Sequence, residues 1–196
     1  LYSRKMKYMR SKNAFQNVIS AIVLQLIIVL TGIYIPQLMI TTYGSSINGM
    51  VSSITQFISY ISLVEAGIGN ASLVALFSPL VNQEYKKVNS IMSATRNFYR
   101  GAGSIFAVLL VGLAMIYPFF SNGGIDTSLI RWMVIVLGSS TLVDFWVLGK
   151  YRVFLNANQK GYIVTVTQSV GTVLNAMICI LLIKFKCSIL LVKAIA

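Results

Sequence analysis

The sequence has 196 residues, of which 57% are hydrophobic and only 10% are charged, and its 16 Lys and Arg against 4 Asp and Glu give a net charge of +12. A soluble domain carries about 25% charged residues, so this composition indicates a chain whose solvent is lipid. The abundance of Leu, Ile, Val and Phe excludes a disordered chain and argues against a basic nucleic-acid-binding domain.

The residues that usually carry metal or nucleophilic chemistry are scarce. The sequence has no histidine, which excludes His-based metal sites, Ser-His-Asp triads and imidazole proton relays. Cys179 and Cys187 fit neither a zinc-ligand spacing nor a disulfide framework. We therefore expect no catalytic residue, no metal and no other cofactor.

The first apolar run, residues 17–40, follows a basic head of five Lys and Arg residues. A transmembrane helix needs about 20 mostly apolar residues, because the hydrocarbon core is about 30 Å thick. The apolar stretch of a signal peptide is only about 7–15 residues long. We therefore expect a retained membrane-spanning helix.

The second apolar segment, residues 47–80, is longer than one perpendicular crossing requires. We expect it to tilt, bend or run out along the interface. Gly67, Gly69 and Pro79 are the natural break points, because glycine and proline weaken a helix.

Three more spans and the start of a sixth are expected, at residues 101–120, 129–149, 161–183 and from about 188. Polar connections should join the spans, among them residues 82–100 and 150–160. The expected fold is an all-α polytopic membrane bundle. Because residue 1 is Leu and the last apolar run is short, we expect the chain to be part of a longer protein.

The positive charges predict the orientation of the chain. With the amino terminus in the cytoplasm, 12 of the 16 Lys and Arg residues fall on inner segments and 4 on outer ones. The two lysines of the last loop, Lys184 and Lys186, fit this topology least well. We expect a multi-pass protein of a bacterial cytoplasmic membrane.

Small and polar residues recur within the apolar runs. In the second segment, positions 52, 55, 59, 62, 66 and 69 follow three- and four-residue steps and share one helix face, with Gln56 beside it. In the fifth span, one face carries Thr165, Gln168, Thr172, Asn175 and Cys179. Such faces serve either close helix packing or a water-filled cavity. Gln56, Gln168 and Asn175 are the candidates for a cavity.

Glu65 and Asp144 are acidic residues inside apolar runs. An ionisable group in the hydrocarbon is costly, so it faces water or a partner. Each is therefore either a proton, cation or substrate site in an inward-opening cavity, or half of a structural ion pair. The residues three and four positions away are apolar or small, so any partner should come from another helix.

Three arginines allow two interpretations. Arg96 and Arg100 lie four residues apart just before the third span and could bind an anionic head group. They could equally be positive-inside flanks. Arg131 lies at the outer start of the fourth span, where the positive-inside rule does not predict a basic residue. Arg131 is therefore a further cavity candidate.

The residues around the second segment carry a family resemblance. Residues 42–49 read Thr-Tyr-Gly-Ser-Ser-Ile-Asn-Gly, residues 53–60 read Ser-Ile-Thr-Gln-Phe-Ile-Ser-Tyr, and residues 63–69 read Leu-Val-Glu-Ala-Gly-Ile-Gly. With the basic start and the Phe-Tyr-Arg at 98–100, this order resembles bacterial Wzx-type polysaccharide flippases of the multidrug/oligosaccharidyl-lipid/polysaccharide superfamily.

The resemblance implies two pseudo-symmetric helical bundles, of which this chain would be most of the first. It implies alternating-access transport of undecaprenyl-diphosphate-linked oligosaccharides for lipopolysaccharide, capsule or exopolysaccharide synthesis. The implied partners are this lipid-linked substrate, membrane lipids, and the polymerase and glycosyltransferases of the same process. Only Glu65, Gly67 and Gly69 match the motif residue by residue.

Two alternatives remain open. A cation-coupled multidrug exporter of the same superfamily would share the fold and the carboxylates. A membrane-embedded lipid-linked glycosyltransferase would need a carboxylate constellation or a metal at the membrane surface, and the expected outer loops offer only Asp126. We therefore expect a transporter rather than an enzyme.

Overall fold

The computed structural model of the protein describes residues 2–120 and 125–195, the side chains of residues 2–11, 64, 66 and 68 excepted. Every regular element of these residues is helical, as expected for an all-α protein. The elements in chain order are α1 (Tyr2–Tyr43), α2 (Ser45–Ser62), the 3₁₀ turn η1 (Leu63–Glu65), α3 (Ala66–Val81), α4 (Tyr85–Phe120), α5 (Thr127–Val143), the π-helical segment η2 (Asp144–Leu148), α6 (Gly149–Ala157), α7 (Gly161–Lys184) and α8 (Ile189–Ile195).

Within the described ranges, four helical stretches are long and apolar enough to cross a membrane. They are Lys12–Tyr43, Tyr85–Phe120, Thr127–Ala157 and Gly161–Lys184. Their outer faces expose large apolar side chains such as Leu30, Val108 and Phe119. Exposed apolar surface of this extent has lipid as its natural solvent, so the chain is a membrane protein.

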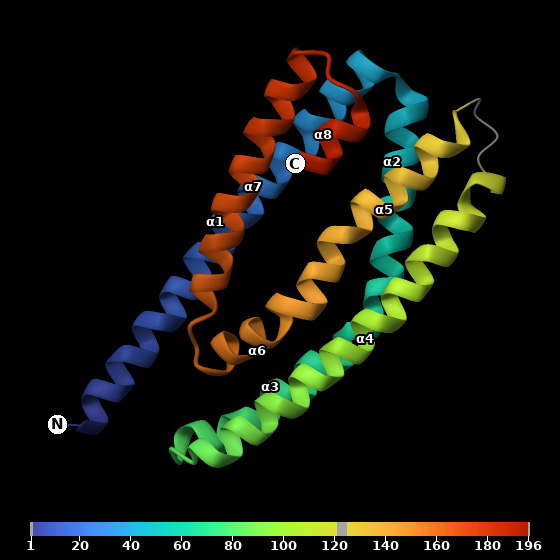
Figure 1. Ribbon diagram of the computed structural model, residues 1–196. Coiled ribbons are helices and arrows are strands. Elements are labelled where there is room, and N and C mark those ends of the chain that lie inside the picture. The colour runs from blue at the N-terminus through green and yellow to red at the C-terminus, as the bar shows by residue number, and fades with distance from the viewer. Residues whose placement is uncertain (1, 121–124, 196) are drawn as a thin grey trace.

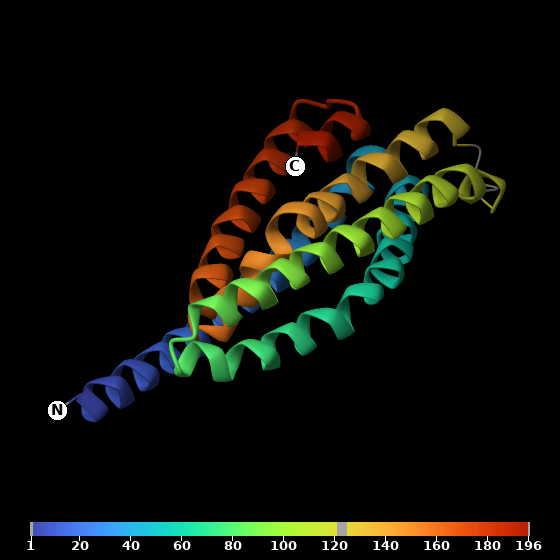
Figure 2. The same ribbon diagram turned by 60° about the horizontal axis from the view of Figure 1, so that its bottom comes forward.

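The second apolar segment is not one helix. It divides into α2 and α3 at the 3₁₀ turn η1, and Figure 2 shows the path bending between the two helices. The break lies ahead of Gly67 and Gly69, and α3 continues through Pro79 to Val81, so the expected break points were misplaced. Pro79 is tolerated because it removes a single backbone donor two residues before α3 ends.

The third and fourth spans are longer than the apolar runs that predicted them. α4 begins at Tyr85, and helical structure continues from α5 through η2 to Ala157, so the polar connections expected at 82–100 and 150–160 are largely helical. The early part of α4 is amphipathic: Val88, Thr95 and Tyr99 are buried along one stripe. A prediction from hydropathy alone assigns such a helix to a loop, because its polar face lowers the mean hydropathy.

In three turns of the described chain, the preceding helix ends with the same backbone geometry. Gln83, Gln159 and Lys186 have positive φ angles of 57°, 59° and 52°. In each case the next N–H donates back to a carbonyl five residues earlier, as Lys160 does to Leu155 at 2.9 Å. This is the Schellman arrangement, here with side chains where glycine is usual.

α1 and α7 run side by side along most of their length (Figure 1). The N–H of Tyr162 donates to Asn17 Oδ1 at 2.5 Å, so α1 caps the first turn of α7. One turn further on, Thr165 Oγ1 donates to Ser20 Oγ at 2.6 Å. These polar residues of the first and fifth spans therefore serve helix packing.

The core lies between α2, α4 and α5. Ile54, Phe106 and Met133 are buried there, one from each helix. The α3–α4 turn, the α6–α7 turn and the amino terminus lie at one end of the bundle, and the α1–α2 and α7–α8 turns lie at the other (Figure 1). The charged residues considered next lie in the half of the bundle that contains α3 and α6, from the α2–α3 bend onward.

Candidate functional site

A pocket of about 380 Å³ opens where the bend between α2 and α3 faces α4 and α6. Its walls include the two charged side chains Glu65 and Arg152 and the phenol of Tyr99. The remaining lining residues are small, polar or aliphatic: Ser59, Ser62, Leu63, Gly69, Asn70, Leu73, Val153 and Asn156. Part of the small, polar face of the second segment thus lines a cavity.

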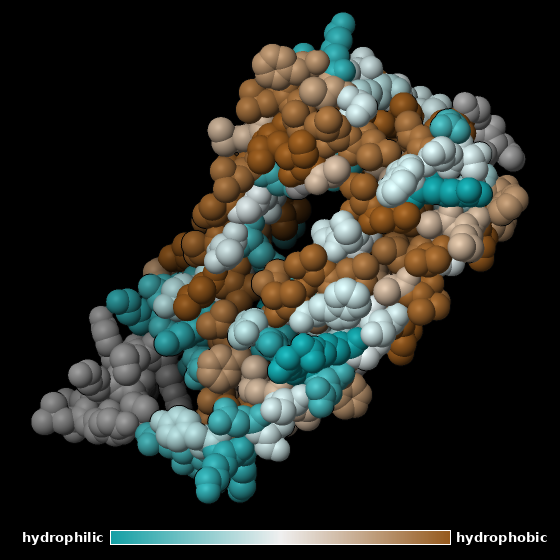
Figure 3. Space-filling view, in the orientation of Figure 1, coloured by the Kyte–Doolittle hydropathy of each residue, from teal (hydrophilic) through white to brown (hydrophobic). Residues whose placement is uncertain are grey.

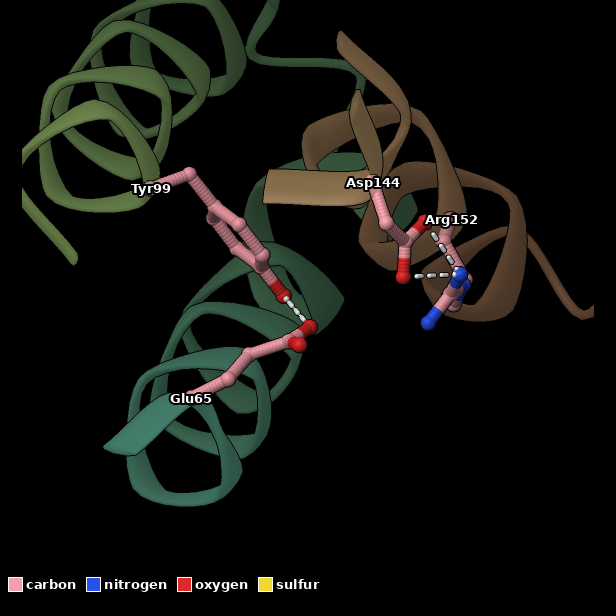
Figure 4. Close-up of polar contacts among 4 residues, drawn as sticks. All are labelled: Glu65, Tyr99, Asp144 and Arg152. Carbon is pink, nitrogen blue, oxygen red and sulfur yellow. Dashed lines mark hydrogen bonds and ion pairs between the residues drawn. The ribbon is translucent and has the colours of Figure 1, made fainter. Parts of the chain in front are cut away.

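Glu65 is placed by the break in the second segment. It is the last residue of η1 and the residue before α3, so its side chain leaves the helix at the bend. Tyr99 Oη donates to Glu65 Oε1 at 2.8 Å from the middle of α4 (Figure 4). The expectation that a partner of Glu65 comes from another helix is confirmed, and that partner is a neutral phenol.

Tyr99 is held between two glycines. Its side chain is buried, with 3% of its surface exposed. A Cβ at Gly149 would lie 2.1 Å from the ring, and a Cβ at Gly69 would lie 3.2 Å from the hydroxyl oxygen. The absence of a side chain at both positions lets α6 and α3 close on the ring. Gly69 therefore has a packing role.

Asp144 pairs with Arg152, eight residues further along the same continuous helix. Arg152 Nη2 donates to Asp144 Oδ1 at 2.5 Å and to Oδ2 at 2.7 Å. The expectation of a partner on another helix was wrong for Asp144. Eight α-helical residues turn by about 800°, which would leave the side chains about 80° apart. The π-helical segment η2 turns less per residue, and this brings them toward one face.

Asp144 holds Arg152 at the rim of the pocket. Only Nη2 of the guanidinium contacts Asp144, and within the described chain Nε and Nη1 of Arg152 have no hydrogen-bond acceptor. Figure 4 shows the two pairs facing one another from η1, α4 and the η2–α6 stretch. The pocket thus offers a carboxylate that can bind a cation or a proton, and guanidinium donors that suit an anion.

Gln168 and Asn175 lie elsewhere, on α7. Both line a cavity of about 530 Å³ between α1 and α7, together with Thr172. Asn175 also lines a cavity of about 360 Å³ where α5, α7 and α8 meet. Figure 3 shows a hollow in this region, between α7 and α5. The polar face of the fifth span therefore serves packing at Thr165 and lines cavities further along.

The other predicted site residues are not in the pocket. Gln56 on α2 and Arg131 on α5 are exposed. Arg96 and Arg100 are also exposed, whereas Thr95 and Tyr99, beside them on α4, are buried. Gly67 is exposed and a Cβ there would meet nothing within 4 Å. None of these residues lines the pocket of Glu65.

Sequence reasoning missed two residues of the pocket. Tyr99 continues a buried stripe through Val88, Thr95 and Phe106, and this helical spacing was a usable signal. Arg152 was counted only among the topology charges. Its pairing with Asp144 depends on the π-helical segment, which has no recognised signature in the sequence.

No protein-family model, no curated protein and no solved structure matches the chain. The features of the chain that bear on function are therefore the residues of the pocket, the shape of the bundle and the motif at residues 42–69.

Proposed function

We propose that the protein is a membrane flippase for undecaprenyl-diphosphate-linked oligosaccharide repeat units, used in bacterial polysaccharide synthesis. The observation that carries the proposal is the pocket at the bend of the second segment, where Glu65 and Arg152 line one space. Charged side chains among membrane helices are costly and mark substrate or ion pathways. The resemblance at residues 42–69 supports the identity of the cargo.

The bend itself favours transport. Transporters place their sites at interrupted helices, because irregular backbone at membrane depth must line a cavity or be buried in protein. η1 interrupts the second segment at Glu65. A membrane protein that only anchors other subunits needs neither the interruption nor the charges.

The topology is part of the proposal. α2 and α3 together traverse the bundle between the same two ends as the longer helices (Figure 1), so we take them as one bent crossing. With five crossings, α8 as the start of a sixth and the amino terminus in the cytoplasm, the proposed topology has the α3–α4 and α6–α7 turns on the cytoplasmic side as well. Lys86, Lys150 and Lys160 lie near these turns, as the positive-inside rule requires.

The mechanism follows from the charges. The anionic diphosphate engages the free donors of Arg152, which Asp144 keeps at the rim. The sugars contact the polar walls of the pocket and of the α7 cavities, and the polyprenyl tail stays in lipid. Rocking of this bundle against a second one then exposes the head group to the other side.

A multidrug exporter coupled to a cation is the second candidate. It is favoured by one observation: the partner of Glu65 is the neutral Tyr99, which leaves the carboxylate charge available for a proton or cationic drug. The glycosyltransferase alternative is weaker, because Asp126 accepts from the N–H of Ser128 and caps α5.

A vesicle assay separates the two candidates. The protein, expressed from its complete gene and reconstituted in liposomes, is given a fluorescent undecaprenyl-diphosphate oligosaccharide, and a membrane-impermeant quencher reports the label in the outer leaflet. The proposal predicts exchange between leaflets faster than in protein-free vesicles. Movement of ethidium down a cation gradient without exchange of the lipid-linked sugar would instead establish the drug exporter.

A further inference from the structure

A second polar cavity, separate from the Glu65 pocket, lies where α5, α7 and α8 meet. It has a volume of about 360 Å³, and its polar walls are Ser139, Ser140, Asn175 and Lys193. It shares Asn175 with the cavity between α1 and α7 and no residue with the pocket of Glu65. Figure 3 shows the hollow onto which it opens.

Among the described residues that line this cavity, Lys193 alone is charged, and it lies on the apolar helix α8. Its neighbour Val192 is fully buried and Lys193 itself is partly buried. The positive-inside rule does not account for Lys193, because the expected topology puts this lysine among the few basic residues on the outer side of the membrane. A cation in such surroundings is costly without a counter-charge.

Among the described residues, no acidic side chain neutralises Lys193, because the four that are present are engaged elsewhere. Glu65 accepts from Tyr99 and Asp144 from Arg152. Glu84 pairs with Lys87 at 2.6 Å, and Asp126 caps α5. Among the described residues, Lys193 takes part in no ion pair.

The other polar groups of the cavity supply hydrogen-bond donors. The thiol of Cys179 donates to Asn175 Oδ1 at 3.9 Å, which fixes the amide oxygen and leaves the NH₂ group for a ligand. The hydroxyls of Ser139 and Ser140 donate to the carbonyls of Val136 and Leu137 and can rotate toward a ligand instead. A cation with neutral donors around it, and no carboxylate, suits an anion.

We propose that this cavity binds an anionic oxygen group, a phosphoryl or carboxylate group, through Lys193 and Asn175. The anion site itself does not depend on the proposed function. Only the identity of the molecule that carries the anion rests on it: this would be the diphosphate or an acidic sugar of the translocated lipid. Arg152 and Lys193 would then be two separate anion sites, in the pocket of the bent helix and in the hollow beside α8.

Calorimetric titration of the purified, detergent-solubilised protein tests the inference, with inorganic pyrophosphate in one arm and glucuronate in the other. Lys193→Gln should weaken binding of the preferred anion roughly tenfold, since one charge-assisted contact is lost. Lys193→Arg keeps the charge and should bind within about threefold of the wild type. Lys186→Gln removes an exposed lysine of the α7–α8 turn and should leave the affinity unchanged.

The outcomes are distinct. Tighter binding of pyrophosphate or of glucuronate identifies the group that the cavity takes. Absence of binding by either anion, or equal affinity in the wild type and a folded Lys193→Gln variant, overturns the inference. If binding depends on Lys193 but the protein moves no lipid-linked sugar, the anion site is supported and the proposed function is contradicted. Melting temperature and elution volume establish that each variant is folded.

Discussion

Tyr99 on α4 donates a 2.8 Å hydrogen bond to Glu65, 34 residues earlier, at the point where the second apolar segment breaks between α2 and α3. The contact fixes the carboxylate on the wall of a pocket that Arg152 also lines. It joins the bent segment to α4, the longest helix of the central core.

Tyr99→Phe should remove this hydrogen bond and leave the ring in place. We expect the free energy of unfolding in detergent to fall by about 1 kcal/mol, the usual net worth of one hydrogen bond. Tyr34→Phe is the matched control, because Tyr34 is exposed on α1 and its hydroxyl makes no hydrogen bond within the described residues. Equal melting temperatures for the two variants would show that the Glu65 contact contributes nothing to stability.

Gly149→Ala should destabilise the protein although alanine favours helices. The new Cβ would lie 2.1 Å from the ring of Tyr99, and overpacking of this kind costs about 1–3 kcal/mol. Gly101→Ala places its Cβ in open space and should raise stability by up to about 1 kcal/mol through helix propensity. Thermal unfolding of both variants measures the difference. The same sign of change in both would refute the proposed contact between α6 and Tyr99.

Asp144 and Arg152 should show energetic coupling in a double-mutant cycle of Asp144→Asn and Arg152→Gln. The side chains are 27% and 33% exposed, so we expect about 1 kcal/mol rather than the larger values of fully buried pairs. The pair of Glu84 and Lys87 is the surface control, with about 0.3–0.5 kcal/mol expected. Chemical denaturation of the four proteins of each cycle gives the coupling. A value near zero for Asp144 and Arg152 would mean that solvent, not Asp144, positions the guanidinium.

Gln159→Gly should stabilise the turn between α6 and α7. The residue has φ 59°, a left-handed conformation that costs a residue with a side chain about 1 kcal/mol or more. Glycine loses more entropy on folding, so a net gain of about 0.5 kcal/mol is expected. Gln25→Gly in the middle of α1 should instead lower stability by about 1 kcal/mol. A loss of stability in Gln159→Gly would contradict the Schellman geometry at this turn.

The architecture was predictable where hydropathy decides it. The first and fifth spans, at residues 17–40 and 161–183, lie within α1 and α7, because long uninterrupted apolar runs have one stable form in lipid. The amphipathic start of α4 was not found, because its exposed polar face lowers the mean hydropathy. The break at η1 was placed too late, since glycine and proline show where a helix is weak but tertiary contacts decide where it bends.

The candidate site was predictable in part for a related reason. Glu65 and Asp144 could be identified because a carboxylate in an apolar run needs a partner or a cavity. Their partners could not be identified by helical spacing. Tyr99 is distant in sequence, and Arg152 aligns with Asp144 only because η2 changes the helical repeat. The exposed Arg96, Arg100, Arg131 and Gln56 lie outside the pocket, so their roles stay predictions.

The most direct test of the account measures surface polysaccharide in a bacterial strain that lacks its own flippase and carries the complete gene. Glu65→Gln should reduce surface polymer roughly tenfold or more and accumulate lipid-linked repeat units, because Gln keeps an acceptor for Tyr99 but removes the negative charge that lines the pocket together with Arg152. Glu84→Gln, which neutralises a carboxylate in the α3–α4 turn, should leave the polymer at the wild-type amount. Wild-type polymer in Glu65→Gln, at equal protein in the membrane, would contradict the central role of the pocket.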